Sequence, residues 1–160
     1  YYLQSRQGSN HSYYTMNRII LVTGGFDPIH GGHIKLIRDA KAVDPDSPVC
    51  VGLNSDEWLI RKKGKYFMDF DERKEVVSGM KDVQLVIPFI DDDGSANDAI
   101  DMCLQIYDLV IFCNGGDRGD GNTPEFDKFK DDRRVHFRWD IGGDDKHNSS
   151  SWILKRWDSK

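Results

Sequence analysis

The chain has 160 residues, of which 38% are hydrophobic and 31% are charged, and its formal net charge is -5. This length supports one domain with a hydrophobic core, and the acidic balance argues against broad binding to nucleic acid. No apolar run is long enough to span a bilayer, which argues against a membrane protein. The three cysteines lie in apolar runs, so we expect buried free thiols in a cytoplasmic protein.

The first 15 residues are polar and aromatic and show no periodicity. We expect residues 1–15 to be a flexible tail or a remnant outside the natural protein, which would then start at Met16. An added edge strand through Tyr13 and Tyr14 is the alternative. The folded domain is expected to cover residues 16–160.

A strand, a glycine-rich loop and a helix are predicted next. Residues 18–23 are apolar and rich in β-branched side chains, which is typical of a buried parallel strand. Gly24 and Gly25 then allow a sharp turn and a close approach to a ligand. His33 lies in the first turn of the following helix, where unpaired amides and the helix dipole attract anions, and His30 lies three residues earlier. The stretch therefore predicts a polyphosphate site.

Other interpretations of this loop are weaker. The two histidines could bind zinc together with Asp27, but only these three ligands are local and no Cys-x-x-Cys accompanies them. The loop also lacks the Gly-x-Gly-x-x-Gly spacing of dinucleotide-binding proteins and the Gly-Lys-Ser/Thr ending of a Walker loop.

Four more strands follow, alternating with helices. The strands are predicted at residues 49–54, 84–89, 108–113 and 135–139. Helices are expected to begin after Asn54 or Ser55, after Asp69 with Glu72 completing a capping box, after Ser95, and at Pro124. The alternation predicts an α/β fold: a single Rossmann-like domain with a five-stranded, mostly parallel sheet, residues 135–139 at its edge, and helices on both faces.

Three further segments are candidates for the site. Residues 61–65 are basic, and residues 114–125 are rich in glycine, so that a flat base could pack on the backbone of Gly115 and Gly116. Both segments follow strands whose carboxyl ends bind ligands in open α/β sheets, although each could also be a plain surface loop. Residues 149–151 are serines at the expected start of a last helix, where hydroxyls and amides could bind an anion or simply cap the helix.

The stretch from Gly24 to His33 resembles the signature of the His-x-Gly-His nucleotidyltransferase superfamily, in its cytidylyltransferase-like branch of the glycerol-3-phosphate cytidylyltransferase type. The resemblance extends from about Met16 to about Trp157. It implies that His30, His33 and Lys62 are catalytic, as cations and hydrogen-bond donors. It implies that the nucleotide is bound by Gly24, Gly25, Phe26, Asp27, Gly32, Lys65, Gly115, Gly116, Asp117, Arg118, Ser149, Ser150 and Ser151.

The serine motif departs from the family pattern. Asn148 replaces an isoleucine, and Leu154 stands where adenylyltransferases carry an arginine. Lys146, Lys155 or Arg156 could take over the role of that arginine. Arg73 resembles a family arginine, and a surface ion pair with Asp69 or Glu72 is the alternative.

The resemblance also implies an activity. The chain would transfer CMP, or less readily AMP, from CTP or ATP to a small phosphorylated metabolite and release pyrophosphate. Mg²⁺ would accompany the nucleotide, with Asp27 as a possible protein ligand, and relatives are commonly homodimers. A non-catalytic nucleotide-binding or regulatory module on the same fold is the alternative.

Overall fold

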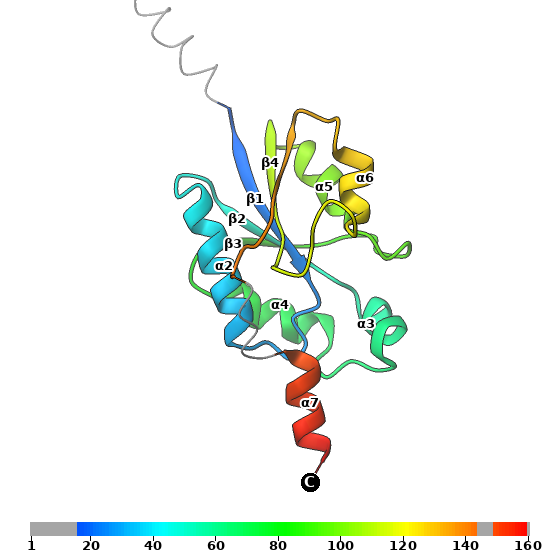
Figure 1. The fold of residues 1–160 in the computed structure, drawn as a ribbon. Coiled ribbons are helices and arrows are strands. Elements are labelled where there is room, and N and C mark those ends of the chain that lie inside the picture. The colour runs from blue at the N-terminus through cyan, green and yellow to red at the C-terminus, as the bar shows by residue number, and fades with distance from the viewer. Residues whose placement is uncertain (1–15, 144–148, 160) are drawn as a thin grey trace, which may run out of the picture.

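The computed structural model describes residues 16–143 and 149–159. Five strands form one sheet in the order β3-β2-β1-β4-β5, and every neighbouring pair is parallel (Figure 1). The strands are β1 (Arg18–Gly24), β2 (Val49–Leu53), β3 (Val83–Pro88), β4 (Leu109–Cys113) and β5 (Val135–Arg138). The predicted five-stranded α/β fold is confirmed, and the sheet is wholly rather than mostly parallel.

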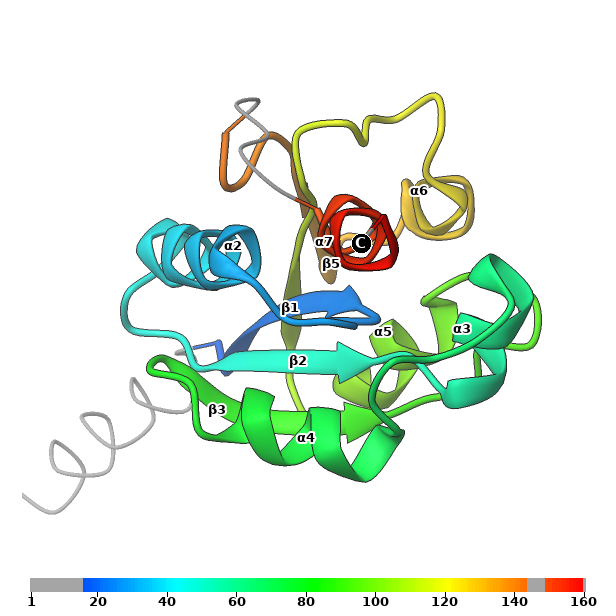
Figure 2. The same ribbon diagram turned by 90° about the horizontal axis from the view of Figure 1, so that it is seen from below.

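The helices cover both faces of the sheet, as predicted. They are α2 (Gly31–Val43), α3 (Asp56–Lys63), α4 (Phe70–Ser78), α5 (Asn97–Leu104), α6 (Pro124–Phe129) and α7 (Ser150–Asp158). Apolar side chains of α2 and α4 pack on one face, whereas those of α5 and α6 pack on the other. The view from below separates these layers, with α7 seen end-on (Figure 2). All residues of β2 and β4 are buried, because helices cover both faces of the sheet at these strands.

The strand order places β1 at the centre of the sheet. From β1 the chain proceeds to β2 and β3 on one side, and then returns to form β4 and β5 on the other. The loops after β1 and β4 therefore diverge from adjacent carboxyl ends. This divergence is the topological switch point at which open α/β sheets bind ligands.

One helix start differs in detail from the prediction. Ser55 and Asp69 cap α3 and α4 as expected, accepting hydrogen bonds from the backbone N–H groups of Trp58 and Glu72. Ser95 was expected to cap α5, but the N-cap residue is Ala96, and the hydroxyl of Ser95 instead accepts a 3.3 Å bond from the N–H of Asn97.

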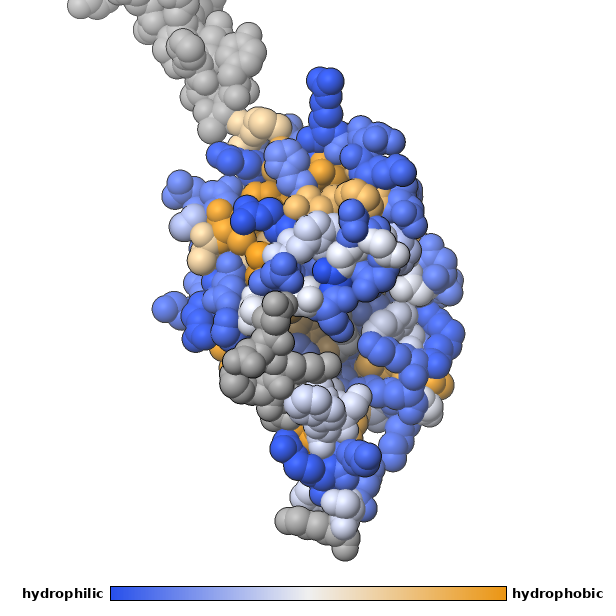
Figure 3. Space-filling model, in the orientation of Figure 1, coloured by the Kyte–Doolittle hydropathy of each residue, from blue (hydrophilic) through white to orange (hydrophobic). Residues whose placement is uncertain are grey.

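Other expectations concern the surface and the cysteines. All three cysteines are buried and free, as predicted. Within the part of the chain that the structure describes, no helix has the length and apolar character needed to cross a membrane. Hydrophilic residues dominate the face shown in Figure 3. The expectations for the tail at residues 1–15 and its alternative edge strand lie outside the described residues.

Candidate functional site

A cleft of about 970 Å³ opens at the carboxyl ends of the central strands. Its walls come from the loop after β1 and the first turns of α2, the loops after β4 and β5, the end of α3, and the start of α7. Its lining residues are His30, Gly31, Gly32, His33, Lys35, Leu36, Lys62, Gly115, Gly116, Asp117, Ile141, Gly142, Gly143, Ser149, Ser150 and Ser151. This volume lies in the range of small-molecule and cofactor sites.

The two histidines stack against each other at the start of α2. Their ring centroids are 3.9 Å apart, and His30 is the N-cap residue of the helix. The Nδ1 atom of His30 accepts a 3.0 Å bond from the N–H of Gly32, and Nδ1 of His33 accepts a 3.2 Å bond from the N–H of His30. Because both Nδ1 atoms are acceptors, each neutral ring carries its proton on Nε2. The capping box thus fixes the tautomer of both rings.

His33 differs from the cation that the sequence led us to expect. Burial, followed by the effects of His30 and Lys63, lowers the pKa of His33 from 6.5 to about 3. The ring is therefore neutral near pH 7, and its Nε2–H is a hydrogen-bond donor without a positive charge. Donors of this kind can stabilise charge on a phosphoryl oxygen.

The shifted pKa predicts how His33 affects stability against pH. The folded protein holds the His33 ring neutral, whereas the unfolded chain binds a proton on it below pH 6.5. The contribution of His33 to stability is therefore complete above pH 6.5 and is lost as the pH falls from 6.5 toward 3. Wild-type protein should therefore lose stability in this window more steeply than His33→Ala, by at most about 1.4 kcal/mol per pH unit. Urea unfolding at intervals of pH measures the difference.

The exposed His136 on β5 provides the control for this experiment, because its side chain lies on the surface of the edge strand. The His136→Ala curve should run parallel to the wild-type curve. Parallel curves for wild type and His33→Ala would contradict the prediction.

The start of α7 joins the loop that follows β1. The hydroxyl of Ser149 caps the helix by accepting a 3.1 Å bond from the N–H of Trp152, and the hydroxyl of Ser150 donates a 2.7 Å bond to the carbonyl of Pro28. Two helix N-termini, those of α2 and α7, therefore border one cleft. Both termini present partial positive charge and backbone N–H groups, which is a favourable arrangement for a chain of phosphates.

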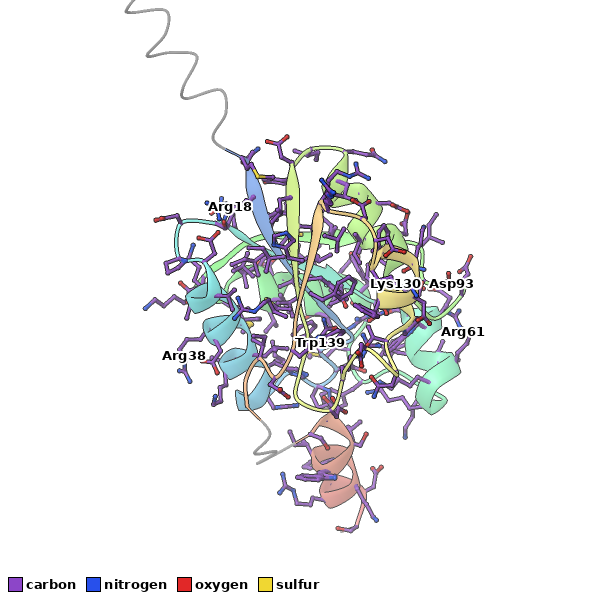
Figure 4. The ribbon with its side chains drawn as sticks, turned by 45° about the horizontal axis from the view of Figure 1, so that its top comes forward. Arg18, Arg38, Arg61, Asp93, Lys130 and Trp139 are labelled. Atoms are coloured by element: carbon purple, nitrogen blue, oxygen red, sulfur yellow. The ribbon has the colours of Figure 1, made fainter. Side chains whose placement is uncertain are left out.

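Lys62 lines the same cleft from the last turn of α3. Its ammonium lies 4.6 Å from the ring centroid of Trp58, in a cation–π contact. The nearby arginines do not share this position: Arg38 on α2 and Arg61 on α3 extend from opposite flanks of the domain (Figure 4), and neither lines the cleft.

The structure brings most of the predicted site residues together. Those that line the cleft are His30, Gly32, His33, Lys62, Gly115, Gly116, Asp117, Ser149, Ser150 and Ser151. Those that do not line it are Gly24, Gly25, Phe26, Asp27, Lys65 and Arg118. The second group supports the cleft or lies beside it.

Asp27 is a buried connector between two loops. Its carboxylate oxygens accept 2.7 Å bonds from the N–H groups of Phe67 and Met68, and the Lys63 ammonium lies 3.6 Å from Oδ2 and donates to the Asp27 carbonyl. Asp27 is only 2% exposed and does not line the cleft. In this structure its carboxylate anchors residues 63–68 to the loop after β1.

Gly25, Phe26 and Gly24 shape the loop from within. A Cβ atom on Gly25 would lie 2.8 Å from a methyl carbon of Leu59, so only glycine lets the loop approach α3 this closely. Phe26 is buried, with its ring centroid 4.7 Å from that of His33, and it packs beside Gly24.

Arg118 and Lys65 have other neighbours. Arg118 lies 3.6 Å from the buried carboxylate of Glu125, and this pairing orders the glycine-rich loop from behind. Lys65 lines a second cavity beside α7, and so does Lys155, one of the residues proposed to replace the motif arginine. Arg156 lines neither cavity, and Lys146 lies outside the described residues.

Sequence reasoning missed several lining residues. Lys35 and Leu36 lie one turn into α2, on the side of the helix that lines the cleft. Lys35 also forms a 2.6 Å ion pair with Asp39. Ile141, Gly142 and Gly143 follow β5 at the same edge as the other loops. The available signal was a pair of glycines within a few residues of the end of a parallel strand, as also found after β1 and β4.

Comparison with known proteins agrees with this geometry. The sequence matches the family described as cytidylyltransferase-like over residues 21–125, which is more than half of the chain. The chain belongs to the cytidylyltransferase-like family. It is therefore a nucleotidyltransferase, as the signature at residues 24–33 predicted.

Individual relatives of this cytidylyltransferase-like chain differ in how much they share. It is 28% identical over 116 residues to the glycerol-3-phosphate cytidylyltransferase of Bacillus subtilis (strain 168), covering 72% of this chain and 81% of that protein. It is 34% identical over 77 residues to the bifunctional protein HldE of Shewanella denitrificans, covering 47% of this chain but only 16% of that protein. These matches support nucleotidyl transfer without identifying the acceptor.

A solved structure supports the fold of this family. The lipopolysaccharide core biosynthesis protein from Thermoplasma volcanium GSS1 superposes with a TM-score of 0.54 at 18% identity, covering 76% of this chain and 95% of that chain. Identity at this level supports the shared fold and nothing finer.

Proposed function

We propose that this protein transfers CMP from CTP to the phosphate group of a small phosphorylated metabolite and releases pyrophosphate. The observation that carries the proposal is the convergence of two helix N-termini and the stacked His30–His33 pair on one cleft. The similarity to the B. subtilis cytidylyltransferase along most of that protein's length favours CTP over ATP.

The chemistry requires alignment and charge stabilisation. An oxygen of the acceptor phosphate attacks the α-phosphorus of the nucleotide and forms the new P–O bond. The bond from the α-phosphorus to the β-phosphate oxygen breaks, and pyrophosphate leaves with that electron pair. Because the attacking oxygen is already an anion, no side chain has to remove a proton.

Each group in the cleft has a role in this step. The Nε2–H groups of His30 and His33 would donate hydrogen bonds to phosphoryl oxygens as charge develops, and Lys62 would neutralise part of it. The N-terminus of α7, with Ser150 and Ser151, would hold the β- and γ-phosphates. Gly115, Gly116 and Asp117 at the opposite wall would lie against the nucleoside.

We propose that Mg²⁺ enters bound to the triphosphate. Among residues 16–143 and 149–159, no group of three His, Cys, Asp or Glu side chains is placed to hold a metal ion, and Asp27 is fully engaged by backbone N–H groups. We therefore propose that the phosphates of the nucleotide, rather than a cluster of side chains within these described residues, supply most of the ligands of the ion. When bound, the ion would neutralise phosphate charge.

A nucleotide screen tests the proposed function. Each of the four nucleoside triphosphates is supplied with Mg²⁺ and, in turn, glycerol 3-phosphate and a set of sugar and alcohol phosphates, and pyrophosphate release is measured. We expect release that requires both an acceptor and CTP. Stronger release with ATP would reassign the donor, whereas tight CTP binding with no acceptor-dependent release would support a non-catalytic binding module instead.

A further inference from the structure

A second cavity of about 520 Å³ lies beside α7, and neither His30 nor His33 lines it. It lies between the segment that joins α3 to α4 and one face of α7. The residues that line it are Lys63, Lys65, Tyr66, Phe67, Ser151, Leu154, Lys155, Trp157 and Asp158. We call this cavity the α7 groove. Neither the family comparison nor the proposed roles of the cleft residues account for it.

The α7 groove meets the nucleotide cleft at Ser151. This residue lines both cavities, and the consecutive Lys62 and Lys63 divide in the same way, the first lining the cleft and the second the groove. A ligand in the groove would therefore lie next to the phosphates held at the N-terminus of α7. Two cavities that share a lining residue suit a reaction between two bound substrates, which have to lie side by side.

One face of α7 supplies the groove with an ordered series of side chains. Ser151, Leu154, Lys155 and Asp158 are spaced three and four residues apart, so they share one side of the helix. Lys155 lies one turn, about 5.4 Å, from Ser151 and hence from the cleft. Its position predicts that an anionic group would bind near the cleft end of the groove.

The charge of the groove favours an anion. Lys63 is already paired with Asp27, whereas the ammonium groups of Lys65 and Lys155 take part in no ion pair within the described parts of the chain. Asp158 is the single carboxylate in the lining and lies one turn beyond Lys155, toward the end of the helix. The two lysines give the groove a net positive charge in a protein that is acidic as a whole.

The remaining wall is aromatic and accessible. Tyr66, Phe67 and Trp157 are 43%, 59% and 72% exposed, and no residue of α7 is buried. Ring faces of this kind bind flat or apolar groups with good contact area. The combination of lysines and rings therefore fits a phosphate ester whose organic part contains a ring.

We propose that the α7 groove is the acceptor site and that the acceptor is a phosphate ester with a ring-bearing organic group. The phosphate would lie by Lys155 and Lys65, directed toward Ser151 and the nucleotide cleft. The ring would pack on Phe67 and Trp157. This inference rests on the proposed nucleotidyl transfer, but binding to the groove can be measured without turnover.

Isothermal titration of the full chain with phenyl phosphate tests the groove directly, with inorganic phosphate as the second probe. Phenyl phosphate should bind at least several-fold more tightly than inorganic phosphate, and saturating CTP should not displace it. Lys155→Ala should weaken its binding about tenfold, and Phe67→Ala or Trp157→Ala several-fold. The matched control is Lys130→Ala, which removes an exposed lysine at the end of α6 (Figure 4). This variant should bind phenyl phosphate as tightly as wild type.

Several results would overturn the assignment. Any one of four results would exclude an acceptor site in the groove. These are that phenyl phosphate fails to bind, is displaced by CTP, binds no more tightly than inorganic phosphate, or binds Lys155→Ala as tightly as wild type. A shift from dimer to monomer in Trp157→Ala on sedimentation, without effect on phenyl phosphate binding, would identify the groove as an interface between copies of the chain and would also overturn it.

Failure of the groove and failure of the proposed function remain distinguishable. If wild-type protein releases pyrophosphate from CTP but phenyl phosphate binding is insensitive to Lys155, only the groove is wrong. If phenyl phosphate binds as expected but no nucleotide and acceptor pair is turned over, only the proposed function is wrong. In an active enzyme, Lys155→Ala should raise the KM for the acceptor and leave the KM for the nucleotide unchanged.

Discussion

Replacing His33 with alanine is expected to lower kcat about 100- to 1,000-fold, the usual effect of removing one preorganised donor to developing charge. His33 Nδ1 accepts from the N–H of His30, so Nε2–H is the donor available to a phosphoryl oxygen. The ring is neutral, because its pKa is lowered to about 3, and the loss should therefore be nearly constant from pH 6 to pH 9. Pyrophosphate release at saturating CTP and acceptor gives the measurement.

The stability of this variant must be checked, since the alanine also removes one half of the capping box. The cost should be about 1 kcal/mol, small enough to leave the protein folded. His136→Ala, which alters an exposed histidine on the edge strand, should keep wild-type kcat. A His33→Ala enzyme that turns over within threefold of wild type would contradict the role assigned to the ring.

The stacked pair should also behave as a unit. His30 accepts from Gly32 through Nδ1 and lies 3.9 Å from His33 between ring centroids, so the removal of either ring disturbs the other. The double variant His30→Ala/His33→Ala should thus lose less activity than the product of the two single losses.

Replacing Arg73 with methionine is expected to destabilise the fold by about 3–5 kcal/mol, as is typical when one partner of a buried ion pair is removed. The Arg73 guanidinium is fully buried and pairs with Asp56 at 2.7 Å. It also donates to the backbone carbonyls of Gly25, Asn54 and Met68, at 2.7–2.9 Å. Methionine of similar length would leave three carbonyls and a carboxylate without their donor. Urea unfolding near pH 7.5 measures the loss.

Two companion variants make this prediction decisive. Lys74→Met changes the next residue of α4, which is exposed, and should alter stability by no more than about 0.5 kcal/mol. Asp56→Asn keeps the size of the partner and removes its charge, and should cost about 1–3 kcal/mol, so it reports on the pair even if Arg73→Met does not fold. A loss below about 1 kcal/mol in Arg73→Met would show that its four contacts are unimportant.

Arg73 also shows why the sequence was misleading here. The local pattern offered a surface ion pair with Asp69 or Glu72, because residues one turn apart on a helix can meet. In the fold, Arg73 turns inward to the carbonyls of loops 19 to 48 residues away in sequence. Helical spacing identifies which residues share a face, but it does not reveal what the other elements place against that face.

The sequence by itself determined the local architecture and the chemistry of the first loop. Apolar β-branched runs, glycines and capping residues depend on neighbours a few positions away, so they predicted the parallel sheet, the start of α2 and an anion site at His30 and His33. The resemblance of this loop to one family then indicated the reaction. Each of these signals lies within a short stretch of the sequence.

Only the tertiary structure decided which loops meet and what charge each group carries. Asp27 became an anchor for residues 63–68, Arg118 turned to Glu125, and Lys65 joined Lys155 in the α7 groove. His33 is neutral because burial, His30 and Lys63 lower its pKa. Burial and long-range contacts depend on how distant segments pack, and for that reason the pattern of neighbouring residues could not specify them.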